Sequence, residues 1–91
     1  MFPERVAAIT ERLRAAFAPL HVEVLDDSRL HAGHAGARAG GGHFRVDIES
    51  AAFAGKRQVE RHRMIYNALA DMMQQDIHAL SIRARAPGEN A

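Results

Sequence analysis

Cysteine is absent from this chain of 91 residues, and so is tryptophan. Without cysteine the protein can form no disulfide, no thiolate nucleophile and no metal site built on its own thiolates. No apolar run approaches the roughly 20 residues that span a bilayer, and residues 1–5 (MFPER) lack the pattern of a signal peptide. We therefore expect a cytoplasmic protein with no membrane association.

A strong net charge is also missing. The formal charge of +1 provides no field that would attract nucleic acid or anionic lipid to the molecule as a whole. Hydrophobic residues make up 47% and charged residues 25% of the chain, as in ordinary folded domains. A chain of this length can enclose one core only. We expect a single domain over residues 1–87 and a polar C-terminal tail over residues 88–91.

The spacing of apolar residues predicts the order αββααβ. Helical spacing predicts a helix from Pro3 to Phe17, ended by Pro19, and a longer helix over residues 57–74. Alternation of apolar and polar residues predicts strands over residues 21–27, 43–49 and 80–85. Ser50 and Gly55 delimit a short helical turn. In the longer helix, Val59, Ile65, Leu69, Met72 and Met73 are expected to face inward and Arg61 to lie on the surface. Helices covering the apolar face of a three-stranded sheet give an α+β fold.

Histidine is the residue type that stands out. His31 and His34 lie in a glycine-rich loop over residues 29–42, His43 begins the second strand, and His78 begins the third. A single histidine is more often structural than a ligand, and this set matches no closed zinc site. An iron–sulfur cluster takes four external ligands, of which histidine can supply two. If such a cluster binds here, a second molecule must provide the thiolates.

A basic group marks the beginning of the long helix. It consists of Lys56, Arg57, Arg61, His62 and Arg63. Cations at a helix N-terminus are disfavoured by the macrodipole, so helix stability does not account for their position. Compensation by Glu60, other acidic residues or solvent is one explanation, and local binding of nucleic acid is the other.

Nothing in the sequence forms a catalytic constellation. Asp26, Asp27 and Ser28 are adjacent residues better explained by a turn, and the glycines of the loop precede a strand and lack the Lys-Ser or Lys-Thr of a phosphate-binding loop. We expect a protein that is not an enzyme.

Several segments together closely resemble the BolA family. They are DDS at residues 26–28, His31, GHFRV at 42–46, FAGK at 53–56, RHRMIY at 61–66 and IHAL at 77–80. The resemblance extends from the first helix to about Pro87. It implies an αββααβ fold related to the class II K-homology domain.

The resemblance also implies a function. BolA-like proteins associate with a monothiol glutaredoxin and share with it a glutathione-assisted two-iron two-sulfur cluster; alone, this chain is expected to be a monomer without cofactor, and with glutaredoxin a heterodimer. The principal cluster ligand of the family falls on His78. A second ligand comes from the loop between the first two strands, where His31 ranks first and His34 is the alternative.

Some members of the family are DNA-binding regulators of stress responses and cell morphology. That activity would use the helix-turn-helix-like segment over residues 56–63, with Lys56, Arg57, Arg61 and Arg63 contacting DNA. The Gly-x-x-Gly loop that clamps nucleic acid in K-homology domains is missing, because Gly55 is followed by Lys56, Arg57 and Gln58. DNA binding is therefore the alternative hypothesis.

Overall fold

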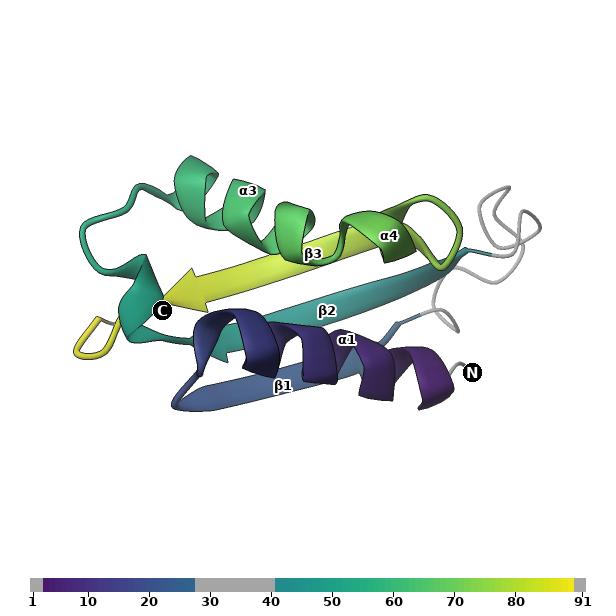
Figure 1. Cartoon of the computed structure of the whole chain (residues 1–91), viewed down its shortest axis with the longest axis horizontal. Coiled ribbons are helices and arrows are strands. Elements are labelled where there is room, and N and C mark those ends of the chain that lie inside the picture. Colours follow the sequence, from purple (N-terminus) through teal and green to yellow (C-terminus); the bar gives the residue numbers. More distant parts are fainter. Residues whose placement is uncertain (1–2, 28–40, 90–91) are drawn as a thin grey trace.

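A computed structural model describes residues 3–27 and 41–89 of the chain (Figure 1). Its elements are α1 (Pro3–Phe17), β1 (His21–Asp26), β2 (Gly42–Glu49), the 3-10 helix η2 (Ala51–Phe53), α3 (Gln58–Ala68), α4 (Ala70–Met73) and β3 (Ile77–Arg85). The predicted order is confirmed. β3 begins at Ile77, one residue before His78 and ahead of the alternation that starts at Leu80, and the predicted long helix is broken in two.

The break lies at Leu69, between α3 and α4. Leu69 has φ −106° and ψ 15°, outside the helical region, and its N–H is shared between the carbonyls of Ile65 and Tyr66 at 3.1 and 3.2 Å. Leu69 itself is fully buried. The helix is thus interrupted at a core residue, and no nearby proline or glycine in the sequence indicates the break.

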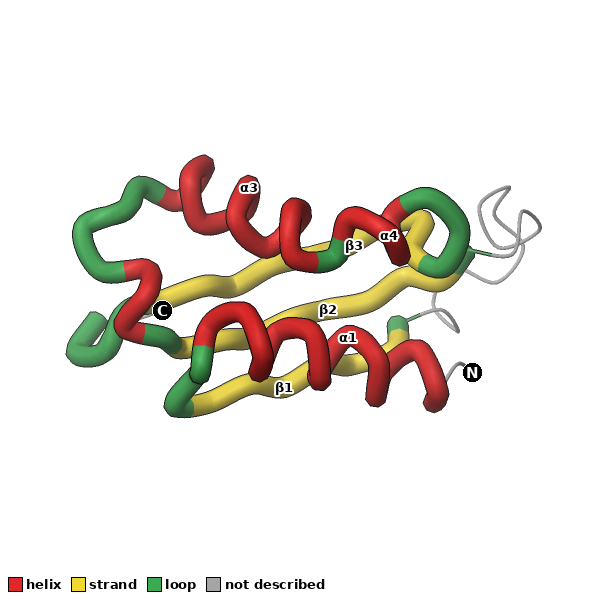
Figure 2. Tube along the Cα trace, viewed as in Figure 1, coloured by secondary structure: helices red, strands yellow, loops and turns green. Residues whose placement is uncertain are grey.

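The three strands form one sheet in the order β1-β2-β3. β1 pairs with β2 in antiparallel orientation, whereas β2 and β3 are parallel. A parallel pair needs a long crossover, and η2, α3 and α4 provide it. Helices α1, α3 and α4 lie on the same face of the sheet (Figures 1 and 2), as the sequence predicts.

The core lies between this helical layer and the sheet. Alternate residues of β2 point into it, and α1 contributes residues at helical spacing. The fully or almost fully buried core residues of these two elements are Ile9, Leu13, Phe17, Phe44, Val46 and Ile48. The opposite face of the sheet is polar: Arg85 of β3 bonds to Asp47 and, at 3.1 Å, to Glu49 of β2.

Ser50 connects the end of β2 to the end of α1. Its hydroxyl donates to the carbonyl of Phe17 at 2.6 Å and accepts from the N–H of Ala52 at 3.1 Å, which confirms it as an N-cap. After Phe17, Ala18 adopts a left-handed conformation with φ 43°. The residue before a proline is disfavoured in the α region, so Pro19 ends the helix as predicted.

The inward face of α3 differs from the prediction. Val59 is 54% exposed and Arg61 only 4%, so the prediction was wrong for both residues. Arg61 precedes the buried Ile65 by four positions and therefore lies on the same side of the helix. A buried arginine is possible here because each of its three guanidinium nitrogens donates at least one hydrogen bond.

The partners of Arg61 come from three segments. Its Nε donates to the carbonyl of Lys56 at 2.9 Å, its Nη1 donates to the carbonyl of Ala84 at 3.2 Å, and Nη1 and Nη2 bind the carboxylate of Glu89 at 2.6 and 2.9 Å. We call this bidentate pair the Arg61–Glu89 clasp. Glu89 also accepts from the N–H of Ala86 at 3.0 Å, so the clasp ties the end of the described chain to α3.

The clasp predicts a specific pH dependence. The hydrogen bond from Arg61 lowers the pKa of Glu89 from 4.5 to about 2. A carboxylate with a lowered pKa stabilises the fold fully above its ordinary pKa, and this stabilisation is lost as the pH falls toward the folded-state value. We expect Glu89→Gln to unfold at lower urea concentration than the wild type at pH 7, and the difference to disappear between pH 4.5 and about 2.

The matched control is Glu11→Gln, at an exposed position of α1, which should follow the wild-type pH dependence throughout. A difference between Glu89→Gln and the wild type that stays constant across this pH range would contradict the assigned role of the clasp.

Candidate functional site

β2 and β3 begin, and β1 ends, at the same edge of the sheet, which we call the loop edge. Because β3 is parallel to β2, both begin there, and β1, antiparallel to β2, ends there. Asp27 donates its N–H to the carbonyl of His43 at 2.7 Å, and Gly42 donates to the carbonyl of Asp76 at 3.0 Å. The carboxylate of Asp27 also pairs with Arg45 at 3.0 Å. The two ends of the glycine-rich loop that carries His31 and His34 are thus fixed beside the start of β3.

His31 and His34, the two candidates for the second ligand, lie outside the described residues. His78 is described, as the second residue of β3, and its side chain is exposed. The loop that carries the other candidates therefore leaves and enters the sheet at the edge where His78 lies.

A β-bulge places His78. Gly42 of β2 pairs with Ile77, but the next residue, His43, pairs with Ala79. His78 is therefore an extra residue with no counterpart on β2. Bulges in parallel pairs are rare, and bulges in general re-aim side chains next to functional sites. Here the bulge allows two consecutive side chains, His78 and Ala79, to be exposed between the buried Ile77 and the partly buried Leu80.

The imidazole of His78 contacts that of His43. Their ring centroids are 5.0 Å apart and the rings are inclined by 50°, a tilted arrangement typical of interacting aromatic pairs. His43 precedes the core-facing Phe44 on β2, so strand alternation directs its side chain to the polar face of the sheet. His43 is nevertheless only 8% exposed. The sequence identifies His43 as the first residue of a strand, but its contact with His78 depends on the bulge, which leaves no signal in the sequence.

The backbone at Gly41 approaches His78 closely from another side. A Cβ atom at Gly41 would lie 2.9 Å from the Cβ of His78 and 3.1 Å from its backbone nitrogen. Any other residue would force one of the two segments to move. Gly41 therefore packs directly against the candidate ligand.

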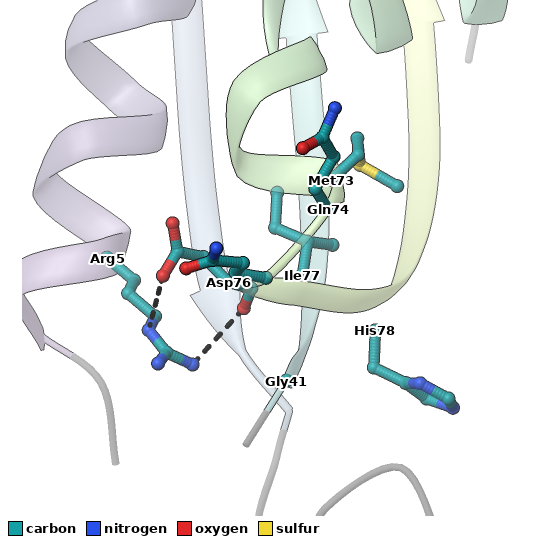
Figure 3. A pocket seen from close by; sticks show the side chains of 8 residues that line it. Arg5, Gly41, Met73, Gln74, Asp76, Ile77 and His78 are labelled. Carbon is teal, nitrogen blue, oxygen red and sulfur yellow. Dashed lines mark hydrogen bonds and ion pairs between the residues drawn. The ribbon is translucent and has the colours of Figure 1, made fainter. Parts of the chain in front are cut away.

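A surface pocket of about 540 Å³ opens beside His78. Figure 3 shows the ring of His78 at its margin, directed away from the pocket residues Met73 and Gln74. On the other side Arg5 bonds to Asp76, with Nε 3.4 Å from the carboxylate and Nη1 3.2 Å from the carbonyl. This pair fixes the N-terminal end of α1 to the turn that leads into β3.

The donor groups of the described residues do not suffice for a metal centre. Within residues 3–27 and 41–89, no three histidine or carboxylate side chains are grouped so that they could hold a metal ion, and the whole chain lacks cysteine. Among these residues His78 offers an exposed imidazole at the loop edge. Such an arrangement can complete a ligand set that another molecule provides, but the described part of the chain cannot form one.

The basic group at the start of α3 is divided by the fold. Lys56, Arg57 and Arg63 are exposed, and Glu60 accepts the backbone N–H of Arg57 at 2.8 Å. That hydrogen bond lowers the pKa of Glu60. Arg61 points into the protein, where its guanidinium is held by the clasp. The three exposed residues are therefore the ones that can reach an anionic partner. None of the described helices is long and apolar enough to cross a membrane.

Known proteins share this sequence and architecture. A family model described as BolA-like protein matches residues 13–89. The DNA-binding transcriptional regulator BolA of Escherichia coli is 45% identical over 74 residues, which cover 81% of this chain and 68% of that protein. SufE-like protein 1, chloroplastic/mitochondrial, of Arabidopsis thaliana is 45% identical over 86 residues, or 89% of this chain, but the match spans only 23% of its own length.

Solved structures agree with these sequence matches. The BolA domain of SufE1 from Arabidopsis thaliana superposes with a TM-score of 0.84 at 43% identity, covering 94% of this chain and 95% of that one. BolA1 from the same plant gives a TM-score of 0.81 at 32% identity, with 96% of both chains covered. The resemblance noted in the sequence is confirmed by the family match and by the fold: the chain belongs to the BolA-like protein family.

Proposed function

We propose that this protein is a non-enzymatic adaptor that binds a monothiol glutaredoxin and shares with it a glutathione-assisted two-iron two-sulfur cluster. The observation that carries the proposal is His78, an exposed imidazole on a β-bulge, in a chain that has no thiolate to offer. The protein alone is a monomer without cofactor, and the complex is a heterodimer.

The residues present fit this division of labour. Neutral imidazole is a good ligand for iron, and histidine replaces thiolate on one iron of some two-iron clusters. When bound, the cluster supplies the iron that accepts an imidazole nitrogen. His78 presents that nitrogen from a strand end, a more rigid support than a free loop. The second nitrogen comes from His31 or, as the alternative, from His34.

The site also favours a partner that approaches from the loop edge. Gly41 holds the end of the loop against His78, and the Arg5–Asp76 pair holds α1 against the turn before β3. The pocket between them lies next to the exposed imidazole. A partner that docks at the margin of this pocket, where the imidazole of His78 lies, brings its thiolates toward that side chain without displacing the core.

The ligand assignment predicts the spectra of the mixed proteins. Adding the wild-type chain to glutaredoxin loaded with cluster and glutathione should change the visible absorption and circular dichroism. His78→Ala should leave the glutaredoxin spectrum as it was, since the imidazole ligand is lost. His31→Ala and His34→Ala, measured in the same way, identify the second ligand by which of them reduces the change.

The control is His21→Ala, because His21 is an exposed histidine of β1 at the opposite end of the sheet, paired with Glu49. It should behave like the wild type. A full spectral change with His78→Ala would refute the ligand assignment. Absence of both a spectral change and a heterodimer on gel filtration with the wild-type chain would refute the adaptor function.

DNA binding is a second candidate function, favoured by the exposure of Lys56, Arg57 and Arg63 and by the similarity to the DNA-binding transcriptional regulator BolA of Escherichia coli. Each phosphate that a basic side chain neutralises releases about one counterion, so affinity falls with salt concentration. Replacing these three residues by glutamine should weaken binding to duplex DNA. It should also reduce the salt slope by about 1 for each phosphate that is no longer neutralised.

Fluorescence anisotropy over a salt series measures both quantities. Arg14→Gln, at an exposed position of α1, is the control and should leave affinity and slope unchanged. Equal affinity and slope for the triple variant and the wild type would exclude this surface as a DNA-binding site.

A further inference from the structure

His43 is a buried imidazole that the proposed function does not use. It is 8% exposed, its Nε2 atom is buried, and its ring contacts that of the exposed His78. It comes from the neighbouring strand, directly after the loop that carries His31 and His34. Of the described histidines, His43 and His78 both lie at this edge and contact each other, but burial separates the buried His43 from the exposed His78.

Burial argues against a ligand role for His43. A ligand to a cluster that is shared with another protein must be reachable by that protein, and His78 meets this condition. His43 is buried and its ring lies against that of His78, so the exposed imidazole of His78 is the one that a docked cluster can reach. The contact between the rings therefore has a different use.

Geometry points to that use. On a regular strand, pairing with β2 would fix the direction of a side chain, but His78 is the extra residue of a bulge and lacks this constraint. Two contacts replace it: the backbone of Gly41 lies against the Cβ and backbone of His78, and the ring of His43 lies against its imidazole. The first fixes the base of the side chain and the second its outer part.

We propose that His43 is a positioning residue: its buried ring packs against the imidazole of His78 and holds it in the orientation presented to the partner. Residues that orient metal ligands from outside the ligand set, most often by hydrogen bonds, typically contribute about 10- to 100-fold in metal affinity; here a ring contact has the orienting role. Holding the ring in advance also reduces the side-chain entropy lost on binding. The proposal deepens the proposed function and rests on it for the meaning of the orientation.

The first test needs no partner. In the isolated chain, the ring protons of His78 experience the ring current of His43, so their NMR chemical shifts report the contact directly. In His43→Ala we expect these shifts to move toward those of the unfolded chain, whereas His43→Phe, which retains a ring, should keep them displaced. His21→Ala should leave them unchanged. Unaltered His78 shifts in His43→Ala would overturn the proposal.

The second test uses the glutaredoxin complex. With His43→Ala, an altered circular dichroism spectrum and an about 10-fold faster loss of visible absorption under an iron chelator are expected. His43→Phe should restore wild-type behaviour. Equal failure of the two variants would show that ring packing is not what matters, and so would overturn the proposal.

The two tests separate the proposal from the function it rests on. If the wild-type chain forms no complex with glutaredoxin, the adaptor function is wrong, yet the NMR measurement still decides whether His43 orients His78. Far-UV circular dichroism establishes that each variant folds. If His43→Ala does not fold, His43→Gln takes its place in both tests, because it removes the ring but retains a polar side chain.

Discussion

Parallel pairing between β2 and β3 is the constraint on which the location of the site depends. Because parallel strands begin at the same edge, the crossover through α3 and α4 returns the chain to the edge where β2 starts. The antiparallel pairing of β1 with β2 brings the end of β1 to that edge too. Residues far apart in the sequence, Asp27, His43 and His78, therefore become neighbours without any direct attraction between them.

The opposite end of the sheet is secured in another way. The buried Arg61 of α3 binds the carboxylate of Glu89. On the polar face of the sheet, Arg85 of β3 binds two carboxylates of β2. The pair of Arg61 and Glu89 is only partly buried, because the side chain of Glu89 is 41% exposed, and the fork of Arg61 also satisfies two backbone carbonyls. Its main effect is to determine which side of α3 faces the sheet.

Periodicity in the sequence predicts most of the fold, because the core positions of the strands alternate and those of α1 recur at helical spacing. It fails for α3, where Val59 looks apolar and Arg61 looks exposed, since the partner that admits Arg61 to the interior lies 28 positions away. The turn at Leu69 has no proline or glycine to signal it. For the site, His78 could be named from family resemblance alone. Three features of the site depend on pairing between strands: the bulge, the contact with His43 and the close approach of Gly41. The periodicity of a single segment carries no information about such pairing.

The hydrogen bond between Asp27 and His43 closes the connection between β1 and β2 at its base. Because the sheet is already joined below this point, changes in the number of residues above it alter only a closure entropy that grows slowly with length. Insertions and deletions within residues 28–40 can thus be accepted without disturbing the strands or the packing of Gly41 against His78. The length of this segment can therefore diverge between related proteins while the rest of the domain stays the same.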